Sequence, residues 1–417
     1  MTTHRREDRQ QPQQKMQRLE PENEIVIVGG GICGLATALA LHRKGINSLV
    51  LEKSEILRAS GAAIGILDNG WRALEQLGVA DRLRQTAIPV QGAREIWLDK
   101  KAKEISAEWS GENRCLRRSD LVNALADALP PDAIRFGCQV VFVELHPSTS
   151  YPILHLQDGN TIMAKLVIGC DGARSAVSNF LNLKPTGVFG LLTTRGMTYY
   201  PIGHPFSHEF VQTYKNNVVV GRVPIGEKLV HWLITQQGSP KGENISKNPE
   251  YVKQLTLHAI NSFPEEIIQM VECSDLESLS FARLRYRAPW ELLTGNFRKG
   301  TVTVAGDAMH VMGHFLGQGG SAGLEDAIVL ARCLSQKLSF IDPITDENGK
   351  VMHNIEAAID QYLKERKMRV ARLSTQSFLI GLLWQSSSMV VKFVIVILMV
   401  VLFNNIALHT KYDCGKL

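Results

Sequence analysis

The sequence predicts an α/β fold, in which a Rossmann-like dinucleotide-binding domain holds an inserted antiparallel β-sheet domain and ends in a C-terminal helical segment. Two observations predict it. A short apolar run, EIVIVGG (24–30), is typical of a buried parallel strand and leads through glycines into a helical pattern. From about 185 to 290 polar and apolar residues alternate instead, and the α/β pattern returns after Gly300. A pocket between the two domains is the expected place for a small molecule.

The chain has 417 residues, which is more than one simple core organises, so we divide it into joined domains. Residues 1–23 are predicted to be a disordered tail, because they are polar and rich in Gln. The dinucleotide-binding domain takes 24–184 and 296–375, and the mostly β substrate domain takes 185–295. Residues 376–417 are predicted to form a hydrophobic C-terminal helix.

Individual elements follow from the same patterns. CGLATALALHRKG, after the first glycines, predicts a helix, and NSLVLEKS predicts a second buried strand. RSDLVNALADALPP predicts a helix with Ser119 as its N-cap and the pair Pro130–Pro131 as its stop. ILHLQDGNTIMAKLVIG predicts a hairpin that turns at 158–160 and feeds another buried strand.

Composition excludes several classes of protein. The net charge of +5 is dispersed, and no basic stripe is interleaved with aromatics, so we expect no nucleic-acid partner. The seven cysteines form no CxxC pair, which fits neither a zinc site nor a disulfide framework, and we expect no metal. A reducing compartment, the cytoplasm, is the simpler expectation.

A first glycine cluster, Gly29-x-Gly31-x-x-Gly34, lies between the first strand and the first helix. This spacing gives a tight turn, a close approach of backbone to a pyrophosphate, and a helix N-terminus that favours anions. Glu52 ends the second strand, where a carboxylate can accept hydrogen bonds from ribose hydroxyls. Strand, glycines, helix and acid together predict a dinucleotide site.

A second glycine cluster lies in GDAMHVMGHFLGQGG (306–320), far along the chain. A simple NAD dehydrogenase needs no such second segment, whereas FAD is long enough to require one. Asp307, at a strand end, suits a hydrogen bond to a ribityl hydroxyl. Gly317, Gly319 and Gly320 precede a helix and would bring backbone N–H groups to the flavin ring. The sequence therefore predicts FAD.

With these motifs the sequence resembles the single-component FAD-dependent monooxygenases of the p-hydroxybenzoate and salicylate hydroxylase type. GGGICG resembles the family's ADP-binding fingerprint, CDGARSAV (170–177) its DG motif, and GDAMH with GQGGSAGLEDA its GD motif and flavin loop. The closing YDCGKL and the overall spacing look most like the plant monooxygenases related to zeaxanthin epoxidase.

The resemblance implies further site residues. Arg118, in RRSDL, matches an arginine that touches the flavin, and SGAAIGI after Arg58 matches a mobile-flavin loop. Asp171 serves both FAD and NAD(P)H, and Gly172 and Arg174 would handle NAD(P)H. The remaining expected FAD-binding residues are Ile32, Lys53 and Ala63.

The resemblance also implies an activity. NAD(P)H would reduce FAD, oxygen would add to the reduced ring, and a flavin hydroperoxide would transfer one oxygen atom to an aromatic or other electron-rich small molecule. Hydroxylation in specialised metabolism is the first expectation. The alternatives are epoxidation of an isoprenoid, an FAD-dependent reductase or desaturase without oxygen transfer, and a non-enzymatic flavin-fold escort protein.

His314 stands where the family usually has proline, and Val311 replaces a second proline. We expect His314 to be the catalytic residue, which hydrogen-bonds or deprotonates a phenolic substrate with a pKa near neutrality. A loop histidine without chemical role is the alternative. His310 is expected to support the flavin loop. Six residues of the β domain are further candidates for the pocket: Arg195, Tyr200, His204, His208, Tyr214 and His231.

The C-terminal segment contains an apolar run, Phe393–Phe403, that is too short to cross a bilayer. Three interpretations stay open: a packed helix, an interfacial anchor and a membrane span. The interfacial anchor would place 389–408 at a membrane surface as a peripheral association, with Lys392 and Lys411 near anionic headgroups.

Overall fold

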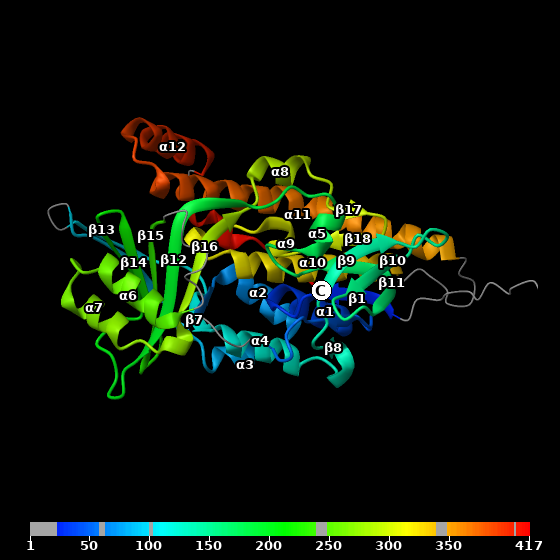
Figure 1. Cartoon of the computed structure of the whole chain (residues 1–417), viewed down its shortest axis with the longest axis horizontal. Helices are drawn as coiled ribbons and strands as arrows, with labels where there is room; N and C mark the ends of the chain where they lie inside the picture. The colour runs from blue at the N-terminus through cyan, green and yellow to red at the C-terminus, as the bar shows by residue number, and fades with distance from the viewer. Residues whose placement is uncertain (1–22, 58–62, 100–102, 239–247, 339–347, 404–405) are drawn as a thin grey trace, which may run out of the picture.

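Two large β-sheets and a small third sheet organise the chain (Figure 1). The computed structural model describes residues 23–57, 63–99, 103–238, 248–338, 348–403 and 406–417. The predicted tail up to residue 22 and the start of the predicted mobile-flavin loop, 58–62, lie outside these ranges. The predicted α/β class with an antiparallel domain and a helical C-terminus is confirmed.

The first sheet has a parallel centre. β1 (Asn23–Val28) pairs in parallel with β11 (Thr161–Gly169) and with β2 (Leu49–Leu51). The predicted hairpin is present, because β10 (Pro152–Leu156) pairs antiparallel with β11 and Asn160 N donates to Asp158 Oδ1. The other strands of this sheet are β8 (Ile134–Arg135), β9 (Val140–Leu145), β17 (Arg298–Lys299) and β18 (Val302–Val304).

Buried helices cover this sheet. α1 (Ile32–Arg43) buries nine of its twelve residues, which explains why its sequence is apolar on all sides. α10 (Gly319–Leu338) packs closely on α1, since a Cβ at Gly323 would lie 3.2 Å from Cys33 Cβ. The surrounding helices are α2 (Asp68–Leu77), α3 (Ala80–Arg84), α5 (Ala176–Phe180), α8 (Pro289–Thr294) and α11 (Asn348–Gln385).

The second sheet is almost entirely antiparallel. Its strands, in spatial order, are β16 (Ser280–Tyr286), β12 (Gly187–Tyr199), β15 (Leu229–Gln237), β14 (Val218–Gly226), β13 (Glu209–Lys215), β5 (Gly92–Trp97) and β6 (Lys103–Glu108). One face carries Trp232 and Ile234 and packs on α6 (Pro249–Ala259) and α7 (Glu265–Glu272). β5 and β6 precede residue 185, so the boundary expected at 184/185 does not separate the two sheets.

A small sheet joins the two large ones, made of β3 (Ala63–Ile66), β7 (Arg114–Arg117) and β4 (Ile88–Pro89). β7 leads directly into α4 (Arg118–Asp127). The predicted N-cap Ser119 is wrong, because it lies inside the first turn and the cap position belongs to Arg117. A strand that runs straight into the helix leaves no extended residue at 119 to act as the cap.

The C-terminal segment extends away from the body of the molecule in a helix and then folds back onto the first domain. α12 (Met389–Leu402) extends beyond the end of α11 at one edge of the molecule (Figure 1). A 3-10 turn (Ile406–Lys411) follows, and the last residues lie back against the first domain, where Leu417 N donates to Gln76 Oε1. None of the described helices is long and apolar enough to cross a membrane.

Candidate active site

The turn between β1 and α1 is so tight that only glycine fits it. Gly29 has a φ of +105°, and a Cβ there would lie 2.6 Å from the carbonyl oxygen of Cys170. A Cβ at Gly34 would lie 1.9 Å from the carbonyl oxygen of Gly29. At Gly31 a Cβ would instead meet nothing within 4 Å, so α1 begins at open space. An open helix N-terminus favours a phosphate group.

Glu52, at the end of β2, is buried and holds this turn. Its Oε2 accepts from the N–H of Gly30 at 2.8 Å, and its Oε1 accepts from the N–H of Ser54 at 2.9 Å. Each carboxylate oxygen carries two lone pairs, so acceptors remain for a ribose hydroxyl. Glu52 therefore shapes the loop and can also bind; the neighbouring Lys53 is exposed.

The second glycine cluster adds an open stretch of backbone. Gly306 has a φ of +59°, and a Cβ there would lie 2.9 Å from Cys33 Sγ. Gly317 has a φ of +61°, and a Cβ at Gly317 or Gly319 would meet nothing within 4 Å. Because α10 begins at Gly319, its first N–H groups, including that of Gly320, are turned toward this open space. A planar, electron-rich group could accept hydrogen bonds there.

The three motifs form one cradle. Cys33 Sγ, at the start of α1, lies 3.8 Å from Cys170 Sγ, at the end of β11. Gly306, between β18 and α9 (Asp307–His310), packs on the same Cys33 side chain. The predicted sites at the first glycines, in CDGARSAV and in GDAMH are thus neighbours in space.

Asp171 carries an unpaired acceptor in this cradle. Its Oδ2 accepts from the N–H of Ala176 at 2.7 Å, whereas its Oδ1 is buried with no hydrogen-bond partner among the described residues. Burial raises the pKa of this carboxyl group above its ordinary value. A buried acceptor without a partner is costly, so Asp171 Oδ1 fits a hydroxyl or N–H donor of a bound cofactor.

Charged side chains from three elements gather on the side of the second sheet. Burial and then the nearby charge of Arg118, at the start of α4, lower the pKa of Arg195 on β12. Desolvation by the surrounding protein raises the pKa of Asp307, although its side chain is still exposed to solvent. The charges of His310, Arg118 and Arg195 oppose that increase. Both arginines therefore lie near the predicted ribityl-binding aspartate.

Comparisons with known proteins identify the cofactor of the family to which the chain belongs. Residues 22–376 match the family described as FAD binding domain. Monooxygenase 1 of Arabidopsis thaliana is 48% identical over 94% of this chain and 99% of the relative, and Monooxygenase 2 of the same plant is 39% identical over 88% and 91%. A solved structure of a HpxO variant of Klebsiella pneumoniae in complex with FAD superimposes with a TM-score of 0.77 at 19% identity, over 93% and 98% of the two chains.

The chain is an FAD-dependent monooxygenase of this family. The predicted family and the predicted use of FAD are confirmed, and the non-enzymatic escort protein is set aside. The cradle fits FAD, because it offers the open N-terminus of α1, the open glycine backbone before α10 and the unpaired Asp171 Oδ1.

The other predicted cofactor residues of the monooxygenase lie at the starts of α1 and β3 and in the turn after β11. Ile32 is buried in the first turn of α1, and Ala63 begins β3. Gly172 has a φ of +83° with open space where a Cβ would be, and Arg174 is exposed beside it. The assignments of Gly172 and Arg174 to NAD(P)H stay predictions.

His314 faces the second sheet of the monooxygenase. It begins a 3-10 turn (His314–Leu316), and its Nε2 lies 3.4 Å from Thr235 Oγ1 on β15. Burial, then the charges of Arg195 and His231, lower the pKa of His314 to about 3. The expected pKa near neutrality is therefore wrong, because a cation is unfavourable in this half-buried, already positive surrounding. Its Nδ1 is buried and has no partner among the described residues.

Three of the six pocket candidates share one face of the second sheet. Residues that pair directly across strands share a face, and Thr193 pairs with Thr235 while Arg195 pairs with Leu233. By the same rule His231 and Tyr214 lie on this face with Thr235, the partner of His314. The other three candidates lie away from it: Tyr200 and His204 in an aromatic group with Phe206, and His208 where its carbonyl oxygen accepts from Gln91 N.

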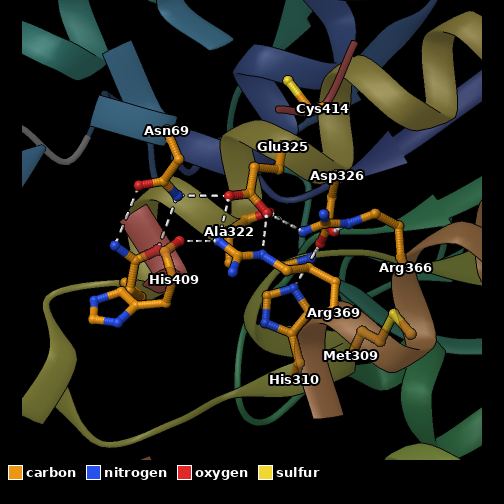
Figure 2. A network of polar contacts seen from close by, with 12 residues as sticks. Asn69, Met309, His310, Ala322, Glu325, Asp326, Arg366, Arg369, His409 and Cys414 are labelled. Carbon is orange, nitrogen blue, oxygen red and sulfur yellow. Dashed lines mark hydrogen bonds and ion pairs between the residues drawn. The ribbon is translucent and has the colours of Figure 1, made fainter. Parts of the chain in front are cut away.

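A buried ionic network that the sequence did not predict lies behind the flavin loop (Figure 2). Asp326 Oδ2 accepts from Gly306 N at 2.8 Å and lies 2.6 Å from His310 Nε2, and its Oδ1 accepts from Arg366 Nε at 2.7 Å. Arg366 also pairs with Glu325 at 2.7 Å, and all these side chains are fully buried. The two acids on α10 are visible in the sequence as the pair in GLEDA. Their partner Arg366, on α11, lies 40 residues after Asp326 in the sequence.

The network extends to α2 and to the C-terminal tail. Glu325 Oε1 accepts from Asn69 Nδ2 at 2.6 Å and from Arg369 Nη2 at 2.8 Å. Arg369 donates in turn to the carbonyl oxygen of His409 at 2.7 Å (Figure 2). Tyr412 lies beside the guanidinium groups of Arg366 and Arg369. The prediction that His310 supports the flavin loop agrees with its contact to Asp326, which also fixes the backbone of Gly306.

Low pH should destabilise the folded monooxygenase through protonation of Asp326. Burial alone would raise its pKa, but the charges of His310 and Arg366 outweigh burial and lower it from 3.8 to about 2. A lowered folded-state pKa contributes stability that is present above the unfolded pKa and is lost as pH falls toward the folded pKa. We expect the free energy of unfolding in urea to fall by about 2–3 kcal/mol between about pH 5 and pH 2 from this group.

Asp326→Asn should remove this part of the acid dependence, and Asp360→Asn, which alters an exposed pair with Arg298, should leave it unchanged. An equal slope of unfolding free energy against pH in Asp326→Asn and the wild type would contradict the assignment.

Proposed function

We propose that this FAD-dependent monooxygenase hydroxylates a phenol or a similarly electron-rich ring, with NAD(P)H as the reductant. FAD, once reduced by NAD(P)H, would supply the activation of molecular oxygen, of which one atom goes to the ring and the other to water. The chain's own part is to bind the ring, to make it electron-rich and to keep water away. Epoxidation and reduction without oxygen transfer are the competing outcomes.

The observation that carries this proposal is the free guanidinium of Arg195. Among the residues that the structure describes, no hydrogen bond or ion pair engages its side chain. It lies on the sheet face that carries Thr235, the partner of His314, and near Asp307 of the flavin loop. A half-buried, unpaired cation favours an anionic ligand, so Arg195 would stabilise a phenolate oxygen. A phenolate ring is more nucleophilic toward an electrophilic oxygen than the neutral phenol.

His314 would act as a neutral hydrogen-bonding partner in this site. With a pKa of about 3 it holds no proton on its second nitrogen at neutral pH and is a weak base. Its unpaired Nδ1 can orient the substrate hydroxyl while Arg195 carries the charge. His314→Pro removes the imidazole without strain, since Gly313 before it has φ −59° and ψ 154°, which suits a following proline. We expect slower turnover and unchanged FAD content.

Arg174 is proposed to bind NAD(P)H. It is exposed next to the open turn at Gly172 and belongs to the segment that also carries Asp171. An exposed guanidinium suits a phosphate that binds only transiently.

We also propose a cytoplasmic enzyme that associates peripherally with a membrane through residues 389–408, of which 404–405 lie outside the described residues. The cysteines support a reducing compartment, because all seven are free. The apolar exposed surface of α12 supports the membrane association.

The proposal predicts a pH signature for Arg195→Gln. The purified wild type should carry flavin absorbance, oxidise NADPH faster with para-ethylphenol and incorporate one atom of labelled oxygen into the product. A cation near the hydroxyl lowers a phenol pKa by about 1–3 units. Arg195→Gln should therefore shift the pH dependence of product formation upward by about one unit or more, with FAD retained.

Arg222→Gln is the matched control for this experiment. Arg222 lies on β14, two strands away from β12 in the same sheet. It pairs with Trp232 and so points to the opposite sheet face, where it covers Phe206. Its replacement should leave the pH profile in place. An unshifted profile in Arg195→Gln would overturn the phenolate role, and NADPH oxidation without oxygen incorporation would favour a reductase.

A further inference from the structure

α12 exposes an apolar surface on nearly all its sides. Eleven of its fourteen residues are large apolar side chains that are between 42% and 75% exposed. They occupy every helical position except 392, 395 and 399. A soluble helix normally buries its apolar stripe, so such a surface needs an occupant.

One narrow stripe already has a partner within the chain. Ile395 and Phe403 are buried and Met399 is half-buried, against Leu379 and its neighbours on α11. Positions 395 and 399 are one turn apart and lie on one line of the helix. This contact sets the position of α12 at the edge of the molecule and leaves the rest of its circumference uncovered (Figure 1).

Shape and charge favour a lipid bilayer over a protein groove. A groove or a second copy would cover one side of a helix, whereas here the apolar side chains surround it. No acidic residue occurs from Arg366 to Tyr412, and Arg372 and Lys411 in this range are exposed. At about 1.5 Å per residue, α12 spans about 21 Å and cannot cross a hydrocarbon layer of about 30 Å. It can insert into one leaflet whose anionic headgroups meet these cations.

The base of α12 is built into the wall beside His314. We call the side chains Phe189, Tyr286, Phe315, Phe378 and Trp384 the aromatic wall. Phe315, next to His314, lies edge-on to Trp384 with ring centroids 5.0 Å apart. Trp384 precedes Ser388, the N-cap of α12, by four residues.

Hydrogen bonds fix this base to the second sheet. Gln385 Oε1 accepts from Gly190 N at 3.0 Å, and the Gln385 carbonyl oxygen accepts from Gln237 Nε2 at 3.4 Å. A bilayer that holds α12 would therefore lie at the aromatic side of the candidate active site.

We propose that α12 inserts into an anionic membrane leaflet and that the enzyme takes a lipophilic phenol from it, with the apolar part of the substrate along the aromatic wall and the hydroxyl at Arg195 and His314. The substrate half of this proposal rests on the proposed hydroxylation of a phenol, whereas the membrane half rests on the exposed surface of α12 alone.

The first experiment is flotation of the full-length holoenzyme with vesicles of phosphatidylcholine, with and without phosphatidylserine. The wild type should bind, and more tightly when phosphatidylserine is present. The double variant Phe393→Glu with Val400→Glu alters two side chains that face away from α11. It should lose binding by about a hundredfold or more, because two apolar side chains that would insert into the leaflet become charges.

The control is Tyr199→Glu with Ile202→Glu, which adds the same charge at two exposed residues, one at the end of β12 and one just after it, and should leave binding unchanged. Equal flotation of the α12 variant and the wild type would overturn the membrane half. A second result would also overturn it: the wild type forms a dimer, the α12 variant is a monomer, and both still bind vesicles. A second copy of the chain would then be what covers α12.

The second experiment compares NADPH oxidation with para-ethylphenol in solution and with para-nonylphenol in vesicles. The α12 variant should keep the wild-type rate with the soluble phenol and lose the vesicle-borne one by about tenfold or more. Equal loss or equal retention of both rates would overturn the substrate half. No stimulation by either phenol, with vesicle binding still lost in the variant, would refute the proposed function and leave the membrane surface standing.

Discussion

Gly34→Ala is expected to give a protein that retains almost no FAD. A Cβ at this position would lie 1.9 Å from the carbonyl oxygen of Gly29, far inside contact distance, and that backbone oxygen cannot turn aside as the end of a flexible side chain could. The start of α1 must then move away from the end of β1 by about 1 Å or more, which displaces the phosphate-binding N–H groups. We expect FAD affinity to fall by at least about a hundredfold, measured by flavin fluorescence on titration of the apoprotein.

Gly226→Ala provides the comparison, because it adds the same methyl group at the end of β14, where the nearest atom would lie 3.8 Å away and φ is not positive. It should bind FAD as the wild type does. FAD retention by Gly34→Ala, with wild-type affinity, would show that the α1 N-terminus does not hold the cofactor.

Arg366→Met is expected to lower the free energy of unfolding by about 3–5 kcal/mol, because it leaves the carboxylates of Glu325 and Asp326 buried with less counter-charge. Asp326 also accepts from the N–H of Gly306, so the flavin loop should loosen and the FAD dissociation rate should rise. Urea unfolding of the holoenzyme and stopped-flow release of flavin measure the two effects.

An exposed arginine separates this effect from the general loss of a charge. Arg298 pairs with Glu356 and Asp360 at the surface, and such pairs contribute about 0–1 kcal/mol. Arg298→Met should therefore change stability little and flavin release not at all. If Arg366→Met cost no more than Arg298→Met, the buried network would not be what holds the loop.

The cofactor site was largely predictable, because local backbone geometry imposes it. Gly29 and Gly34 are required by a turn that closes within six residues, and Gly306 and Gly317 have positive φ values that glycine favours. Asp171 was predicted from its motif, and the structure adds that one of its oxygens is buried without a partner in the described chain.

The protonation of His314 was not predictable. The sequence indicates an ionisable side chain in the flavin loop, and an ordinary histidine titrates near neutrality. Its lowered pKa depends on burial and on Arg195, which lies on a strand more than one hundred residues earlier. The same holds for the pocket candidates, since only strand pairing decides that Arg195 shares a face with Thr235 and that Tyr200 does not.

The sequence by itself determined the α/β class, the inserted antiparallel domain, the FAD cradle and the presence of an apolar C-terminal segment, because periodicity and glycine requirements are local. Only the tertiary structure decided that β5 and β6 complete the second sheet and that Arg366 neutralises two acids behind the flavin loop. It also decided that α12 packs by one narrow stripe and leaves its other sides exposed. These features depend on which distant segments meet, and burial and charge act only once they have met.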